Sequence, residues 1–258
     1  MGGSCPFVPA PATSFMSGHW PVGVAHGNCT KFRNNRFTRR LFRAAILCTR
    51  RVARPWRLAQ YLRETVEPKL HLGCGPNVLP GWLNTDVDWR SPCAVYLDAS
   101  RRLPLPDRVF DLVFAEHLVE HLSRDAGARM LSECHRVLKP GGMLRLSTPD
   151  LRFVLRVYSE PSPLTQEYLA WWFERYEPAR PVCAAAFLNL FMRRWGHQYL
   201  YDIDTLIDAL ASVGFGEIRV CRPGQSTVPE LRGVEQHGKV IPERFNEQES
   251  ICVEAVKQ

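Results

Sequence analysis

The stretch Lys69-Leu-His-Leu-Gly-Cys-Gly-Pro-Asn77 decides the fold of this chain. Its first half alternates apolar and more polar residues, a pattern that is typical of a β-strand entering a sheet. Gly73 and Gly75 then omit two Cβ atoms where the chain turns sharply and where a ligand can approach the backbone. The stretch therefore predicts a strand that ends in a glycine turn.

A second short strand is predicted shortly afterwards, in Trp82-Leu-Asn-Thr-Asp-Val-Asp88. Two carboxylates, Asp86 and Asp88, lie at its end. A glycine turn after one strand and an acid after the next is how parallel α/β sheets hold a ribose-bearing cofactor. The sequence thus predicts a cofactor site, with Asp86 and Asp88 as competing candidates for the ribose ligand.

Five more strands and two helices follow in the pattern of the later sequence. The predicted strands are 92–98, 110–115, 143–148, 217–221 and 250–256. The predicted helices are 118–138, which Lys139-Pro-Gly-Gly142 should end, and 204–215. Seven strands with helices between the early ones indicate an α/β fold built on a mostly parallel sheet.

The composition fits one α/β domain with additional segments. The chain has 258 residues, of which 45% are hydrophobic and 23% charged, and no apolar run approaches the roughly 20 residues that span a bilayer. We expect a disordered tail at 1–30, a basic helical arm at 31–64 and one domain at 65–258. Within this domain, 151–200 is predicted to be a helical, aromatic insertion, where the adjacent Trp171 and Trp172 cannot both face inward.

The positive charge is concentrated in the arm. Eleven of the 33 Lys and Arg lie between Lys31 and Arg63, whereas all 26 Asp and Glu lie from Glu64 onward. The rest of the chain is therefore mildly acidic, which argues against a nucleic-acid partner for the domain.

A helix is predicted over 38–54 of the arm, with Pro55 ending it. Its apolar face should consist of Leu41, Ala45, Cys48 and Val52. Two interpretations are favoured equally: a solvated helix that packs this face on the domain, and peripheral contact of the arm, residues 31–63, with an anionic membrane surface. A nucleic-acid contact and a targeting presequence stay open as alternatives.

The cysteines favour a reducing compartment. Nine cysteines are scattered along the chain, and no Cys-x-x-Cys motif occurs. A disulfide framework or a structural zinc site is therefore not expected, whereas a cytoplasmic location is expected.

Five short segments that occur in a fixed order are the most specific feature of the sequence. Together they resemble the class I S-adenosylmethionine-dependent methyltransferases, most closely a bacterial branch associated with surface-saccharide genes. The segments are His71-Leu-Gly-Cys-Gly75, Asn84-Thr-Asp86, Leu103-Pro-Leu-Pro-Asp-Arg-Val-Phe-Asp-Leu-Val113, Glu116-His-Leu-Val-Glu-His-Leu122 and Arg136-Val-Leu-Lys-Pro-Gly-Gly142.

The resemblance implies a Rossmann-like fold, with helices on both faces of the sheet, an antiparallel last strand and S-adenosyl-L-methionine as the cofactor. It also implies methyl transfer to an oxygen or nitrogen of a small-molecule or saccharide-like acceptor. The cofactor-binding residues that it implies are His71, Gly73, Cys74, Gly75, Asp86, Asp98, Ala99 and Glu116. A turn-capping role stays open for Asp86 and Asp98.

The resemblance places Glu116 and His117 toward the methyl group and the substrate. If the acceptor is a hydroxyl, His117 is the first candidate base and His197 the second. An ordinary loop histidine stays open as the role of His197. His117-Leu-Val-Glu-His121 also spells the inverted zinc-protease motif, but no third ligand is evident from spacing, so no metal is expected.

Three other functions compete with this interpretation. A methyltransferase-like binding or regulatory domain without catalysis is the main alternative. A nicotinamide-dependent oxidoreductase is disfavoured because Val78 stands where a dinucleotide fold needs its third glycine. A nucleic-acid methyltransferase is disfavoured because Ala115-Glu-His117 stands where a base-methylating motif would follow the fourth strand.

Overall fold

The computed structural model describes residues 36–258 except 89–90 and 92, and side chains from residue 44 onward. The predicted tail at 1–30 and the first residues of the arm lie outside the described residues. In the part of the chain that is described, no helix is long and apolar enough to cross a membrane.

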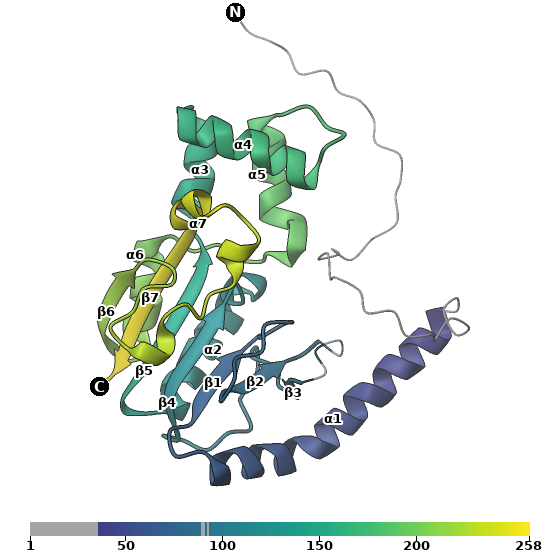
Figure 1. The fold of residues 1–258 in the computed structure, drawn as a ribbon, viewed down its shortest axis with the longest axis vertical. Coiled ribbons are helices and arrows are strands. Elements are labelled where there is room, and N and C mark those ends of the chain that lie inside the picture. Colours follow the sequence, from purple (N-terminus) through teal and green to yellow (C-terminus); the bar gives the residue numbers. More distant parts are fainter. Residues whose placement is uncertain (1–35, 89–90, 92) are drawn as a thin grey trace, which may run out of the picture. The chain divides into compact units, whose positions relative to one another are not determined.

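One seven-stranded sheet in the order β3-β2-β1-β4-β5-β7-β6 forms the centre of the fold (Figure 1). Strands β1 to β5 pair in parallel, and β7 runs antiparallel to both of its neighbours. The predicted fold class is therefore confirmed. The strands are β1 (Lys69–Leu72), β2 (Leu83–Asp86), β3 (Val95–Tyr96), β4 (Phe110–Glu116), β5 (Leu138–Pro149), β6 (Phe215–Cys221) and β7 (Ser250–Lys257).

Seven α-helices accompany the sheet in the described residues, together with four short 3-10 helices. The α-helices are α1 (Arg36–Glu64), α2 (Arg124–Val137), α3 (Leu151–Ser159), α4 (Pro163–Tyr176), α5 (Ala184–Arg193), α6 (Ile203–Ser212) and α7 (Glu243–Glu249). The 3-10 helices are η1 (Val119–His121), η2 (Arg194–Gly196), η3 (Pro229–Leu231) and η4 (His237–Lys239).

The two faces of the sheet are covered differently. Val113 and Ala115 of β4 belong to the large core that includes the apolar sides of α2 and α6. Leu112 and Phe114, which point the other way, pack with Trp82 and with Leu231 and Val234 of the segment between β6 and β7. Residues 73–82 connect β1 to β2 without a helix, so this later segment covers the face that the short connection leaves open.

A second apolar core lies among α3, α4, α5 and α7 (Figure 1). Tyr168, Trp172, Phe187 and Phe245 are fully buried in it. Trp172 is 1% exposed, whereas Trp171 is only partly buried against the same cluster. Helices α3, α4 and α5 lie within residues 151–200, and together with α7 they form a helical layer with its own core.

Helix α1 continues through Pro55, so the prediction that Pro55 ends it was wrong. A proline inside a helix removes one hydrogen bond and clashes with the preceding turn, at a cost of about 3 kcal/mol. Tertiary contacts after Pro55 outweigh this cost. The Arg57 guanidinium donates to the carbonyls of Cys93 and Ala94, at 2.8 and 3.1 Å, and Leu58 is buried in the main core.

The predicted packing face of α1 was also wrong for the residues that are described. Ala45, Cys48 and Val52 are exposed, and Val52 retains 75% of its accessible surface. The helix packs through a later set of residues, Leu58, Tyr61 and Leu62, since these follow the proline and reach the sheet.

The region around Lys139-Pro-Gly-Gly142 was predicted to end a helix, but α2 ends at Val137, and these four residues lie within β5. They fall where the pairing register with β4 shifts, between Leu138 and Met143, so the glycines accommodate an irregularity in the strand. The predicted helix over 118–138 is also interrupted, because Ser123 caps the start of α2 and η1 precedes it.

Candidate active site

The glycine turn after β1 places Gly73 and Gly75 in the left-handed region, with φ of 65° and 52°. The two glycines have different surroundings. A Cβ on Gly73 would lie 2.8 Å from Cδ1 of Leu118, whereas a Cβ on Gly75 would meet nothing within 4 Å. Gly73 is therefore needed for packing against Leu118, and Gly75 leaves its backbone open to a ligand.

Asp86, at the end of β2, is joined directly to this turn. Its Oδ2 accepts a hydrogen bond from the backbone N–H of Gly75 at 2.7 Å, and its Oδ1 accepts one from the N–H of Asp88 at 2.5 Å. The carboxylate is buried and holds the two strand ends together. Each oxygen has a second lone pair, so Asp86 can cap the turn and still accept from a ligand hydroxyl.

His71 and Cys74 have side chains that are buried beside this turn. The His71 ring lies 3.1 Å from Oδ1 of Asn84 and packs on Phe114, and burial lowers its pKa to about 4. Burial raises the pKa of the Cys74 thiol to about 12. Both side chains are less than 3% exposed, so their positions favour a structural role.

Asp98 and Ala99 follow β3. Asp98 Oδ1 accepts from the backbone N–H and the hydroxyl of Ser100, at 3.0 and 2.6 Å, and its other oxygen pairs with Arg101. Ala99 is buried in the main core. The turn-capping arrangement that the sequence left open for Asp98 is therefore present.

Glu116, the last residue of β4, receives the segment that follows β6. Its carboxylate accepts hydrogen bonds from the backbone N–H of Gln236 and of His237, between 2.8 and 3.0 Å. This contact between residues 120 positions apart was not predicted from the sequence. It brings His237 to the end of β4.

His117 adopts a left-handed conformation, with φ of 47°, which is strained for a residue other than glycine. Its Nδ1 lies 3.1 Å from Oε1 of Glu120. In the described part of the chain, its buried Nε2 has no hydrogen-bond partner. Burial lowers the pKa of His117, but the hydrogen bond and the charge of Glu120 outweigh it, so the pKa is raised. The effect of His117 on Glu120 is reciprocal: the pKa of this buried carboxyl is lowered.

A second histidine–carboxylate pair lies against the first. The rings of His117 and His237 are 3.9 Å apart between centroids. His237 Nε2 is 3.3 Å from Glu249 Oε1, and Tyr168 donates its hydroxyl to Glu249 Oε2 at 2.6 Å. These three residues come from η4, α7 and α4, and the sequence carried no signal for their meeting.

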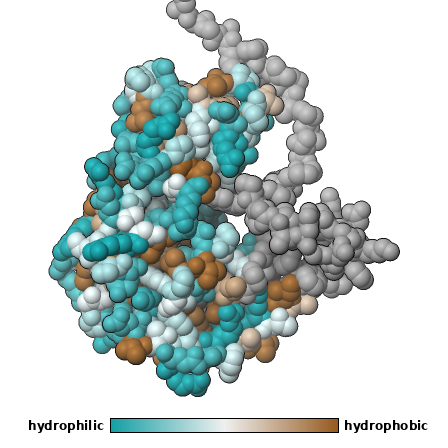
Figure 2. Space-filling model, viewed as in Figure 1, coloured by the Kyte–Doolittle hydropathy of each residue, from teal (hydrophilic) through white to brown (hydrophobic). Residues whose placement is uncertain are grey.

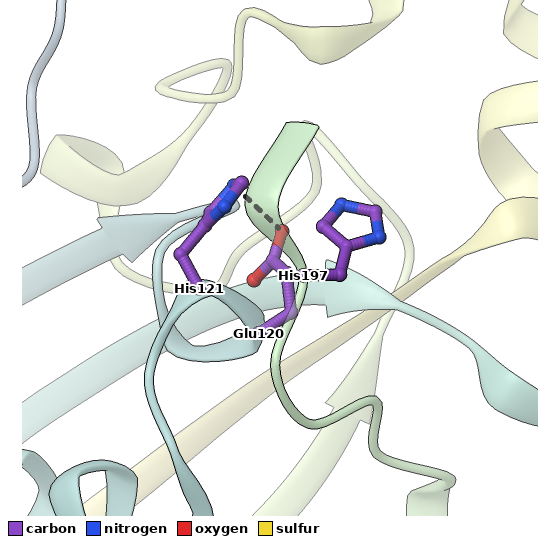
Figure 3. Close-up of side chains that lie close together, drawn as sticks. All are labelled: Glu120, His121 and His197. Carbon is purple, nitrogen blue, oxygen red and sulfur yellow. Dashed lines mark ion pairs between the residues drawn. The ribbon is translucent and has the colours of Figure 1, made fainter. Parts of the chain in front are cut away.

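His197 is placed next to Glu120 and His121 by the loop after η2 (Figure 3). The His121 and His197 rings are 5.1 Å apart between centroids, and His121 Nε2 is 4.0 Å from Glu120 Oε1. His197 Nδ1 is 2.8 Å from the carbonyl oxygen of Phe191, and burial lowers the pKa of His197. Both predicted base candidates, His117 and His197, therefore surround the same buried carboxylate.

Residues 70–146 match the family model of the methyltransferase domain. This stretch, which is less than half of the chain, is similar to that family. The match confirms the resemblance to methyltransferases and does not distinguish the surface-saccharide branch. The matched residues include the glycine turn, Asp86 and the Glu116–His121 segment, and end within β5.

A "Probable S-adenosylmethionine-dependent methyltransferase" from Mycolicibacterium smegmatis is 48% identical over 48 residues. The chain spans only 18% of the length of this relative, and the match covers 19% of this chain.

Two solved methyltransferase structures are similar over most of the chain. A SAM-dependent methyltransferase from Thermotoga maritima is 20% identical, with 86% of this chain and 97% of that chain covered and a TM-score of 0.43. Another from Archaeoglobus fulgidus is 17% identical, with 86% and 98% covered and a TM-score of 0.44.

Proposed function

We propose that this chain is an S-adenosylmethionine-dependent methyltransferase whose acceptor is an oxygen or nitrogen of a small or saccharide-like molecule. The observation that carries the proposal is the hydrogen bond from Gly75 N to Asp86 Oδ2 within the methyltransferase domain. It joins the open glycine backbone to a carboxylate at the carboxyl edge of a parallel sheet, where such sheets bind nucleoside cofactors. The acidic balance of the domain favours an acceptor other than nucleic acid.

The residues at this edge fit the cofactor. Gly75 has no atom within 4 Å of its missing Cβ, so the amino-acid end can approach the main chain of Gly73–Gly75. The unused lone pairs of Asp86 match the two hydroxyl donors of a ribose. Asp98 and Ala99 would border the adenine. His71 and Cys74 would contribute through their backbone, because their side chains are buried.

S-adenosylmethionine supplies a methyl group that is already activated at the sulfonium, so the protein has chiefly to bind and align the acceptor. Alignment of this kind can lower a barrier by ~7–11 kcal/mol. For a hydroxyl acceptor, His117 is the proposed base. Glu120 holds Nδ1, and the buried Nε2 has no hydrogen-bond partner among the described residues, so Nε2 is the atom that can take the proton.

Glu116 and His197 take different positions in this proposal. The carboxylate of Glu116 already accepts from two backbone amides, so we assign it to holding the Gln236–His237 segment over the site. His197 keeps one ring nitrogen on the Phe191 carbonyl and directs the other toward Glu120. It remains the second candidate base.

The test of cofactor binding is calorimetry on the full chain with S-adenosylmethionine, S-adenosylhomocysteine and NAD. We expect both adenosyl ligands to bind and NAD to show no binding. Asp86→Ala should weaken the adenosyl ligands by about 1–3 kcal/mol, since a charged hydrogen bond is lost. Asp111→Ala is the matched control, because Asp111 lies near the other end of β4 and pairs with Lys139. Equal affinity in both variants would remove Asp86 from the site.

A second candidate function is a methyltransferase-like domain that binds the cofactor without catalysis. One observation favours it: the chain's own Gln236–His237 segment covers Glu116 and stacks on His117. The two functions differ in product. We expect S-adenosylhomocysteine to form when the protein is given S-adenosylmethionine and a small-molecule extract. Cofactor binding with no product from any fraction would favour the non-catalytic function.

We also infer that α1 contacts an anionic membrane surface. Cys48, Val52 and Trp56 form an exposed apolar stripe, and Val52 and Trp56 are 75% and 67% exposed. The helix carries nine arginines, and Glu64 is its only acid. Figure 2 shows hydrophobic residues exposed beside hydrophilic ones at the lower right, where Figure 1 places α1. Apolar and basic residues side by side are what anionic bilayers attract.

Sedimentation with vesicles tests this contact. The protein should bind vesicles rich in phosphatidylserine and not vesicles of phosphatidylcholine alone. Trp56→Ser should reduce binding, whereas Val66→Ser, at an apolar residue 93% exposed beyond the end of the helix, should not. Equal loss in the two variants, or no binding to the anionic vesicles, would contradict the inference.

A further inference from the structure

We propose that Glu120, His121 and His197 form a binding site for one divalent first-row metal ion, for which Zn²⁺ is the best fit. Each of the three residues offers one ligand atom, and these atoms all lie within 4.8 Å of one another. Figure 3 shows the three side chains converging from two segments, η1 and the loop after η2. Two imidazoles and one carboxylate are a donor set that zinc and its neighbours prefer.

Glu120 is the buried member of the three. Its side chain has no exposed surface, and its Oε2 accepts a hydrogen bond from the Thr148 hydroxyl at 3.0 Å. Its buried Oε1 faces the histidines, at 3.1 Å from His117 Nδ1 and 4.0 Å from His121 Nε2. A buried carboxylate needs charged or hydrogen-bonding partners, and a cation between Glu120, His121 and His197 would supply one more.

His197 is held in place by a backbone carbonyl. Its Nδ1 lies 2.8 Å from the Phe191 carbonyl oxygen, which fixes the proton on Nδ1 and leaves the lone pair on Nε2. Metal-binding histidines are almost always held in this way, with the other ring nitrogen donating to a carbonyl or a carboxylate. The orientation of His197 is therefore that of a ligand prepared for a metal.

The backbone holds the two segments in register. Gln198 donates its main-chain N–H to the carbonyl of Glu120 at 2.7 Å and its side-chain amide to the carbonyl of His121 at 2.6 Å. Trp195 has a φ of 62°, a strained value that directs the loop back toward η1. These contacts bring His197 to the carboxylate without any metal.

The spacing requires only a small adjustment. Zinc bonds of about 2.0–2.1 Å at tetrahedral angles place the donor atoms about 3.4 Å apart. His121 Nε2 is 4.0 Å from Glu120 Oε1, and the His121 side chain is 34% exposed, so its ring can move inward. Mg²⁺ and Ca²⁺ would be disfavoured, because they prefer a shell of oxygen ligands.

Three protein ligands leave one coordination position open, which is the arrangement of catalytic rather than structural zinc. His117 Nδ1 pairs with the same Glu120 carboxylate, so the open coordination position would adjoin the proposed base. A hydroxyl bound there would lose its proton more readily. This role rests on the proposed function, whereas metal binding itself does not.

The site differs from the zinc motif that the sequence spells. In that motif His117 and His121 would share the metal from one face of an α-helix. Residues 119–121 instead form a 3-10 turn, and His117 directs Nδ1 to Glu120. The third ligand that was not evident from the sequence is His197, which is 76 positions beyond His121 in the chain.

The experiment is metal titration of the full chain after treatment with a chelator, without cofactor or acceptor. Zn²⁺ is measured by equilibrium dialysis and elemental analysis, and Co²⁺ by visible absorption. We expect one equivalent of each, with the visible bands of four- or five-coordinate Co²⁺ and no thiolate charge-transfer band. Because cofactor and acceptor are absent, failure here would leave the proposed function standing.

Variants assign the ligands. His121→Ala and His197→Ala should each weaken Zn²⁺ binding at least about tenfold. His135→Gln, at a histidine of α2 that packs on Phe215, is the matched control and should bind like the unchanged protein. Thermal unfolding of the metal-free variants checks that they fold, and the half-buried His121 gives the milder change. No stoichiometric binding, a thiolate band, or unchanged affinity in His121→Ala would overturn the proposal.

Discussion

The two ends of the candidate site are built in different ways. The end that we propose to bind the cofactor, called the cofactor end, consists of Gly75 and Asp86. These residues follow neighbouring parallel strands and are joined by one hydrogen bond. The histidine end gathers His117, His197 and His237 from segments that are far apart in the chain. The first end follows from local rules of strand and turn, whereas the second depends on how the whole domain packs.

Removal of His117 should produce the largest effect and should separate the two ends. For His117→Ala we expect cofactor affinity to stay unchanged and turnover to fall by about 10²–10⁴-fold, the usual contribution of a general base. Turnover is measured as the initial rate of S-adenosylhomocysteine formation with an extract that supports it. Full activity would exclude His117 as the base. Lost cofactor affinity would show that the two ends are not independent.

Arg145 holds the segment that brings His237 to the site, and its replacement should break this attachment. This buried guanidinium pairs with Glu235 and with Glu254, whose Oε1 lies 2.6 Å from Nη1. Arg145→Met leaves two buried carboxylates without their partner and should lower the free energy of unfolding by about 3–5 kcal/mol.

Denaturant unfolding measures the effect of Arg145→Met against a control. Arg219→Met removes a guanidinium whose pair with Glu217 is more than half exposed, so its cost should stay under about 1 kcal/mol. Equal stability of the two variants would show that the buried pairs do not hold the segment.

The cofactor end should carry a pH dependence of stability through His71. Burial lowers the pKa of His71 to about 4, below its ordinary value of 6.5. The unfolded chain then binds more protons than the folded one as the pH falls. The contribution of His71 to the free energy of unfolding is therefore complete above pH 6.5. It is lost as the pH falls toward 4, and the total loss is about 3 kcal/mol.

His71→Phe removes this titration and should flatten the fall in unfolding free energy between pH 6.5 and 4, measured by denaturant unfolding at several pH values. Asn84 Oδ1, the partner of His71, also accepts from the N–H of Leu79 at 2.9 Å, so the variant leaves it bonded. An unchanged slope would show that His71 does not account for the dependence.

The smallest of these effects should separate the two glycines of the cofactor turn. Gly75→Ala places a side chain in the left-handed region but meets nothing, so we expect a stability loss of about 1–2 kcal/mol. Gly73→Ala has the same backbone strain and also a contact of 2.8 Å with Leu118, so its loss should be larger. Thermal unfolding compares the two. A larger loss for Gly75→Ala would contradict the assignment of their roles.

The sequence predicted the sheet, and it placed the glycine turn and Asp86 together, because these features depend on neighbouring segments. The register that pairs Leu70 with Leu83 brings the ends of β1 and β2 to one edge, so a glycine turn and an acid at those ends must meet. The same reasoning failed at Pro55, where contacts of Arg57 outweigh the local cost of proline.

The histidine end could be predicted only in part. His117 and His197 were identified as candidates, but nothing in their spacing indicated that both approach Glu120. His237 reaches His117 because Glu116 binds the backbone of residues 236 and 237. Backbone donors leave no mark in a sequence, and the residues that they position cannot be inferred from pattern alone.

The most direct test of the central claim is a crystal structure of the full chain with S-adenosylhomocysteine bound. We expect density for the ribose against the Asp86 carboxylate and for the amino-acid end along the main chain of Gly73–Gly75. A ligand located elsewhere, with no ribose hydroxyl within hydrogen-bond distance of Asp86, would contradict it.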